Sequence, residues 1–399
     1  MKMNNIFYKS VLILLLIVSS IIISCNKNSY RASNDEFLIK AIFSNSKGEI
    51  LYLYELNVHD KTLLDSAKIN EDGQFVIKHK INEPGFYLLY QNKNNFITLL
   101  ANKGETIEIT ADLQQLARTY NVKGSPGSSL IHEFEAFTRE NNKKVEKLSL
   151  AYEKLKNSPQ ILEIQDSLNN EFKIILEDQK KKVKSFITKN NNSLASLIAI
   201  NRRFREHTVV SEKDDFIYFD LLDRTLSAIY PNNKHTIEHH KRVNAIKLEQ
   251  EEARLAKERL APGKKAPHYE LPSIEGKIIN SENLKGKIVI LYFWASWNAL
   301  SRQLNPKLVN IYKKYKNKGL EIVGISLDNV NDIWRAAIKL DKLEWIQLND
   351  FLGWDSPVIK DYYVKKLPHL CLIDAEGNII ENNTNIDEIQ NKIYLYLKN

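Results

Sequence analysis

The run from Lys287 to Trp294 is apolar at every residue after the lysine and lacks the polar alternation of a half-exposed strand. The run predicts a strand that is buried on both faces, at the centre of a sheet. Other apolar segments surround it: helix-like stretches at 298–316, 332–340 and 386–397, and strand-like stretches at 321–327, 369–374 and 379–380. Strands alternating with helices predict an α/β layer fold over residues 262–399.

Residues 35–126 have a different pattern, in which short β-rich runs are separated by turn residues such as Asn, Asp and Gly. The strand candidates lie at 37–43, 50–56, 74–77, 86–90, 96–100 and 106–110. Strands at such regular spacing predict an antiparallel β-sandwich or barrel. No catalytic combination of residues is apparent in this segment, and we interpret the isolated His59 and His79 as surface or strand residues.

Residues 127–261 predict a helical region and linker. Leu168, Phe172 and Ile175 share one helix face, and Asn192 to Ala195 can begin a second helix containing Leu197, Ile198 and Phe204. The charged stretch from Glu238 to Leu260 predicts an exposed connecting helix, which ends before Ala261-Pro262-Gly263.

The first 25 residues are typical of an export signal. Lys2 and Lys9 precede the uncharged run Val11 to Ile23, which is too short to span a bilayer about 30 Å thick. Cys25 follows Ser24 and resembles the lipidated cysteine of a bacterial lipobox. We therefore expect a lipoprotein signal peptide at 1–24 and a lipidated tether at 25–34, with an ordinary signal peptide as the alternative. The resemblance implies anchoring in the cell envelope, at the outer membrane and facing the periplasm.

Charge and cysteine content exclude several functions. The chain has 57 basic and 49 acidic residues, a net charge of +8, but the two signs are interspersed, so we expect no nucleic-acid binding. Two cysteines among 399 residues cannot form a disulfide framework or a Cys-rich zinc or iron–sulfur site. His235, His239 and His240 could form a metal site, but a solvated turn is the better interpretation, and we predict no metal and no cofactor.

The C-terminal segment resembles envelope thioredoxin-like proteins of the TlpA/ResA type. The resemblance is carried by Gly263 to Pro272, by Leu284-Lys285-Gly286-Lys287 leading into Phe293 to Trp297, and by Leu367-Pro368, which resembles the cis-proline loop of that family. It implies a thioredoxin-like fold for 262–399, preceded by the β-domain and helical region found in many lipid-anchored relatives.

The catalytic motif of this family is missing. Its Cys-x-x-Cys should follow Trp297, but the four residues there are Asn298-Ala299-Leu300-Ser301. Thiol–disulfide exchange needs an attacking thiolate and a resolving thiol, and neither an amide nor a hydroxyl can replace them. Cys371 is expected to be an inert core thiol, and a hydrolytic pairing of Ser301 with His369 is a weaker alternative. We therefore expect no catalytic residues.

Binding can remain without catalysis. In the family, the loop before the cis-proline offers backbone groups to an extended peptide beside the tryptophan of the active-site loop, and this chain has both Trp297 and Pro368. The alternative is that both residues only determine the fold. We expect a non-catalytic binding or assembly role towards an extended peptide or envelope protein; the competing hypotheses are an oxidoreductase in envelope redox homeostasis and a structural spacer.

Overall fold

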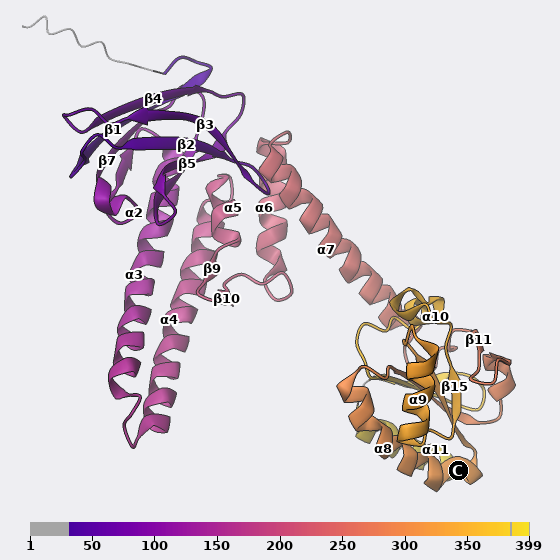
Figure 1. Ribbon diagram of the computed structural model, residues 1–399. Coiled ribbons are helices and arrows are strands. Elements are labelled where there is room, and N and C mark those ends of the chain that lie inside the picture. Colours follow the sequence, from indigo (N-terminus) through magenta and orange to yellow (C-terminus); the bar gives the residue numbers. More distant parts are fainter. Residues whose placement is uncertain (1–31, 384, 399) are drawn as a thin grey trace, which may run out of the picture. The chain divides into compact units, whose positions relative to one another are not determined.

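The computed structural model describes residues 32–383 and 385–398, and Cys25 and the predicted signal segment lie outside them. The chain divides into two compact units, the first ending at Ile246 and the second beginning at Lys247. Helix α7 (Lys234–Arg259) contains the division point, so its first turns belong to one unit and its last turns to the other (Figure 1).

The first unit begins with two four-stranded sheets. One has the order β4-β1-β7-β8 and the other β3-β2-β5-β6. The strands are β1 (Glu36–Ser44), β2 (Ile50–Leu56), β3 (Lys61–Lys68), β4 (Gln74–Lys80), β5 (Gly85–Asn92), β6 (Asn95–Ala101), β7 (Thr106–Asp112) and β8 (Asn121–Lys123). The predicted antiparallel arrangement is wrong for one pair, because β1 runs parallel to β7 while it is antiparallel to β4.

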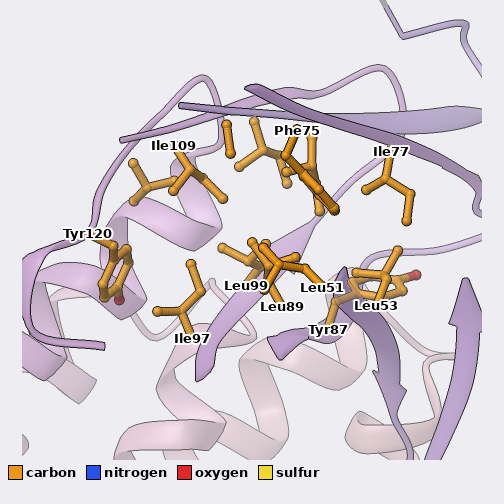
Figure 2. Packing of buried hydrophobic residues seen from close by; sticks show 14 of the residues in the cluster. Leu51, Leu53, Phe75, Ile77, Tyr87, Leu89, Ile97, Leu99, Ile109 and Tyr120 are labelled. Atoms are coloured by element: carbon orange, nitrogen blue, oxygen red, sulfur yellow. The ribbon is translucent and has the colours of Figure 1, made fainter. Parts of the chain in front are cut away.

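The two sheets enclose one apolar core, which confirms the predicted sandwich (Figure 2). Alternate residues of most strands enter it, as Leu51 and Leu53 do from β2 and Phe75 and Ile77 from β4. This alternation follows from the period of two that a strand imposes on its side chains.

Helices follow the sandwich in the first unit. They are α2 (Leu116–Thr119), α3 (Pro126–Leu155), α4 (Ile161–Lys189), α5 (Ala195–Ile200) and α6 (Phe216–Ile229). The long helices α3 and α4 pack against each other as a hairpin (Figure 1). Phe204 is not in the helix predicted for it: α5 ends at Ile200, and Phe204 belongs to the short strand β9 (Arg203–Phe204), which pairs with β10 (His207–Thr208).

The second unit contains a five-stranded sheet with the order β15-β14-β13-β16-β17. These strands are β13 (Ile288–Trp294), β14 (Leu320–Ser326), β15 (Ile346–Leu348), β16 (His369–Ile373) and β17 (Ile379–Asn383); β11 (Glu270–Pro272) and β12 (Ile278–Asn280) form a separate hairpin. The helices are α8 (Ala299–Tyr315), α9 (Asn331–Asp341), α10 (Pro357–Asp361) and α11 (Ile386–Lys398). All residues of β13 are buried, which confirms the predicted central strand.

Two apolar cores lie on the two faces of this sheet. Leu291 and Phe293 of β13 enter the core that also holds Ile359 of α10, whereas Tyr292 and Trp294 enter the core that holds Leu308 of α8. Within the part of the chain that the structure describes, no helix is long and apolar enough to cross a membrane.

Two glycines with the same backbone conformation allow a test of the sandwich packing. Gly73 (φ +74°) and Gly104 (φ +76°) both lie in the left-handed region, but a Cβ at Gly73 would lie 2.2 Å from the Phe43 carbonyl oxygen. A Cβ at Gly104 would meet no atom of the described chain within 4 Å. Gly104→Ala should destabilise the unit by about 1–2 kcal/mol, and Gly73→Ala by about 2 kcal/mol more, since backbone must move.

Urea unfolding followed by far-UV circular dichroism measures both variants against wild type. Equal destabilisation by the two alanines would show that the contact with Phe43 is not a constraint.

Candidate functional site

The helix that follows β13 is capped by a side chain at the position of the first missing cysteine. Asn298 is the N-cap of α8, and its Oδ1 accepts the Ser301 N–H at 2.8 Å. The first turn of a helix presents unpaired N–H groups and a partial positive charge, which in a redox protein can stabilise a thiolate. Here a neutral amide uses that position, so the helix end is satisfied without an anion.

The second missing cysteine is replaced by a hydroxyl without access to a base. The Ser301 side chain is fully buried, and its Oγ has no hydrogen-bond partner among residues 32–383 and 385–398. A serine nucleophile needs a neighbouring base to remove its proton. The Ser301 hydroxyl therefore cannot take the role that a thiol would have here.

A buried polar network lies beneath this turn of α8. The Tyr292 hydroxyl is 3.1 Å from the Ser301 carbonyl oxygen and 2.8 Å from Asn305 Oδ1. Asn305 Nδ2 donates to Asp341 at 2.6 Å, and the Arg302 guanidinium donates to both oxygens of the same carboxylate. Burial raises the pKa of Tyr292, so the phenol stays protonated at neutral pH. The network connects β13 and the end of α9 to α8 and holds the start of α8 in place.

Asp328 connects the loops at the carboxyl ends of the parallel strands. Its buried carboxylate accepts the backbone N–H of Ser296 at 2.9 Å, the Ser296 hydroxyl, and the Ser326 hydroxyl at 2.7 Å. Its carbonyl oxygen accepts Asn349 Nδ2 at 3.0 Å. The loops after β13, β14 and β15 are thus fixed to one another. Asp328 was not among the predicted site residues, although a carboxylate directly after a predicted buried strand was a usable signal.

The proline loop reaches the same edge of the sheet. The Leu367–Pro368 peptide bond is cis, and β16, which begins at His369, runs antiparallel to β13 with His369 opposite Phe293. The start of β16 therefore lies beside the end of β13, so Pro368 and Trp297 belong to one edge. Both predicted binding residues therefore lie in loops at the same end of β13 and β16, and their role in binding stays a prediction.

Cys371 lies on the wrong face of the sheet for chemistry at α8. It pairs with Leu291, and both side chains enter the core opposite the one that contains Tyr292 and α8. Burial raises the pKa of its thiol far above the usual range. His369 is also separated from Ser301, because its ring packs on Phe293 and its Nε2 is 2.7 Å from Asn382 Oδ1. The structure does not bring together the predicted Ser301–His369 pair.

Apolar side chains are exposed on the loops that Asp328 connects and on the first turn of α8. Trp297 is 58% exposed, and Leu300, Val330 and Leu352 are also exposed. Single exposed apolar residues are common, but these four all follow the carboxyl ends of parallel strands, which is where open α/β sheets bind their ligands. We name this set, together with Pro368, the loop surface.

The three neighbouring histidines each have a hydrogen-bond partner within the first unit. His235 Nε2 is 3.1 Å from the Leu56 carbonyl oxygen, and His239 Nε2 is 3.0 Å from that of Phe219. His240 instead contacts Asp223. No group of three metal-ligating side chains occurs in the described parts of the chain. His235 and His239 attach α7 to β2 and α6, so the predicted solvated turn is wrong for these two.

Both units match known families. The model of the AhpC/TSA family matches residues 262–382, and residues 37–130 match a domain of unknown function, DUF4369. The first match covers the five-stranded sheet and the loop surface. The second covers the sandwich and the start of α3.

Relatives of the second unit are thiol-disulfide oxidoreductases. Over 125 residues the chain is 34% identical to thiol-disulfide oxidoreductase ResA of Bacillus cereus, covering 31% of this chain and 70% of that protein. A solved thiol-disulfide oxidoreductase from Bacteroides fragilis NCTC 9343 is 33% identical, covering 33% of this chain and 98% of that one, with a TM-score of 0.32. The thioredoxin domain of an oxidoreductase from Bacteroides vulgatus is 30% identical, covering 35% and 99%, with a TM-score of 0.33.

The position of His239 predicts acid sensitivity of the first unit. Burial lowers the pKa of His239 below its ordinary value of 6.5, so the folded state binds fewer protons than the unfolded state as pH falls through that value. Stability should therefore be lost on acidification, by at most about 1.4 kcal/mol per pH unit for this residue. Hydrogen exchange in α6 and the first turns of α7, corrected for intrinsic rates, measures the loss between neutral and mildly acidic pH.

The matched comparison uses two substitutions to glutamine. His239→Gln should reduce the pH dependence, whereas replacement of the exposed His59 should leave it as in wild type. An unchanged pH dependence in His239→Gln would contradict the assignment.

Proposed function

The chain belongs to the ResA-type family of thiol-disulfide oxidoreductases, and because its thiol positions are occupied by Asn298 and Ser301, we propose that it binds extended polypeptide without redox chemistry. The observation that carries the proposal is the loop surface: the apolar side chains at this edge remain exposed although the thiols are gone. Exposed hydrophobic side chains and free backbone groups can bind an extended peptide, whereas disulfide exchange needs two thiols.

The two competing roles do not account for this surface. An oxidoreductase would need a thiol at the N-terminus of α8, and Cys371 is on the other face of the sheet. A spacer would have no use for exposed Trp297 and Leu300 at a fixed sheet edge. A binding role explains both the retained cis-proline and the exposed apolar residues.

We further propose that the protein acts in the cell envelope, anchored by lipid at Cys25 to the outer membrane and facing the periplasm. The support is the sequence alone: an uncharged run followed by Ser24-Cys25 and a polar tether. More than one acyl chain on a single residue gives stable rather than transient anchoring. Tethering would keep the loop surface near newly exported polypeptides.

The binding proposal is tested with an unfolded probe that has no free thiol. Carboxymethylated, fluorescently labelled insulin B chain should bind the purified full chain without its signal segment, and Trp297→Ala should weaken binding about tenfold, or about 1.4 kcal/mol. Leu340→Ala is the matched control, because Leu340 is an exposed apolar residue of α9 and should have no effect. Absence of binding would favour the spacer, and equal affinity in all three proteins would show that the probe binds away from Trp297.

The loss of redox chemistry is tested by adding the missing thiols. Wild type should not reduce insulin disulfides above a protein-free control, whereas the double variant Asn298→Cys/Ser301→Cys should gain turnover on the same scaffold. Wild-type turnover that disappears in Cys371→Ser would overturn the non-catalytic proposal.

The anchoring proposal is tested in cells. Cys25→Ala should move the protein from the membrane to the soluble fraction and abolish labelling by a fatty-acid analogue, because the acylated sulfur is lost. Ser29→Ala, a small polar change in the tether, should partition as wild type. Continued membrane partitioning and labelling of Cys25→Ala would contradict a lipid anchor at this residue.

A further inference from the structure

A groove lies in the second unit, with the last turns of α7 on one side and α10 and the loop that follows it on the other. Its volume is about 730 Å³, within the range of about 300–1,000 Å³ that is typical of ligand sites. The residues that line it come from 252–259, 354 and 359–365, so it shares no residue with the loop surface.

One wall is a single face of α7. Glu252, Leu255, Ala256 and Arg259 have the spacing i, i+3, i+4, i+7, which places them on one side of a helix. Ala256 and Leu260 are buried, and Leu260 belongs to the core shared with α10. These contacts hold the end of α7 in place, while Leu255 remains 51% exposed in the groove.

The opposite wall is aromatic. Trp354 is 47% exposed, and Ile359 of α10 is buried at the groove. Tyr363 has a φ of 49°, a left-handed conformation that is unusual for an aromatic residue. The ammonium of Lys365 lies 4.4 Å from the centre of its ring, so a positive charge is held at the groove edge.

The charges at the groove are mostly positive. Arg259, Lys360 and Lys365 line it, against the single carboxylate of Glu252. Arg259 uses one N–H to bind the Asp361 carbonyl oxygen and keeps further donors in its planar fork. Lys360 is 3.7 Å from Asp355, but that pair is exposed and therefore weak. A ligand with negative charge would complement these cations.

We propose that this groove binds an acidic segment of a partner polypeptide, with one large apolar side chain held between Leu255 and Trp354. The groove offers an apolar wall for that side chain and cations for the carboxylates beside it. A second copy of this chain is a poor occupant, because it carries the same net charge of +8. The groove does not depend on the loop surface, and its occupant need not be unfolded.

The probe is a labelled synthetic peptide in which a Leu-Phe pair is flanked on both sides by glutamates. It should bind the purified protein, and its affinity should fall steeply when salt is raised. A peptide with lysines in place of glutamates should bind at least about tenfold more weakly. Equal affinity for the two peptides would overturn the proposed charge complementarity.

The site is located by variants on both walls. The double variant Lys360→Glu/Lys365→Glu and the single variant Trp354→Ala should each lower the affinity for the glutamate peptide about tenfold or more. Circular dichroism checks that both variants fold. Lys339→Glu and Ile278→Ser are matched controls, since they change an exposed cation and an exposed apolar residue elsewhere in the second unit. If the groove variants misfold, single Lys360→Gln and Leu255→Ser changes provide milder tests.

The outcome is distinguishable from that of the insulin B chain experiment. If the groove variants lose binding of the glutamate peptide but still bind insulin B chain, the groove proposal is supported. If only Trp297→Ala loses binding of the glutamate peptide, the peptide binds at the loop surface and the groove proposal is overturned.

Discussion

The strand β13 is buried along its whole length and paired on both sides, by β14 in parallel and by β16 in antiparallel orientation. A strand in this position can expose neither its backbone nor its side chains to water, so chemistry can occur only where it ends. Trp297 and Asn298 follow that end directly, and the antiparallel partner brings Pro368 to it. The candidate site is thus a consequence of where the central strand stops.

The same strand separates the remaining thiol from the site. Side chains alternate between the two faces of a sheet, so Leu291 and Cys371 share one core while Tyr292 and α8 share the other. The body of the sheet therefore lies between Cys371 and the first turn of α8. Loss of the cysteine pair is not compensated by the thiol that survives, and an Asn cap stabilises the helix end in place of a thiolate.

The features that were predicted correctly have strong local patterns. The apolar run of β13 and the alternating strands β1, β2 and β4 can each be recognised without their neighbours. Strand β3 was missed because it is mostly exposed, so its sequence lacks a clear alternation. The parallel pairing of β1 with β7, the polar contacts of Asp328 and the groove between α7 and α10 depend on residues far apart in the chain. A single sequence does not specify which of these distant segments meet.

Leaving large apolar side chains exposed forgoes the stabilisation that their burial would give. Burying a large apolar side chain stabilises a protein by about 1.5–3 kcal/mol, and Trp297, Leu255 and Trp354 are each about half exposed. The backbone that carries them is fixed: Asp328 holds the loop at Trp297, and the buried Ala256 and Leu260 hold α7 at Leu255. These side chains are kept outside the cores by rigid supports, as residues that contact a partner must be. Apolar side chains on fixed supports are what the proposed binding role requires.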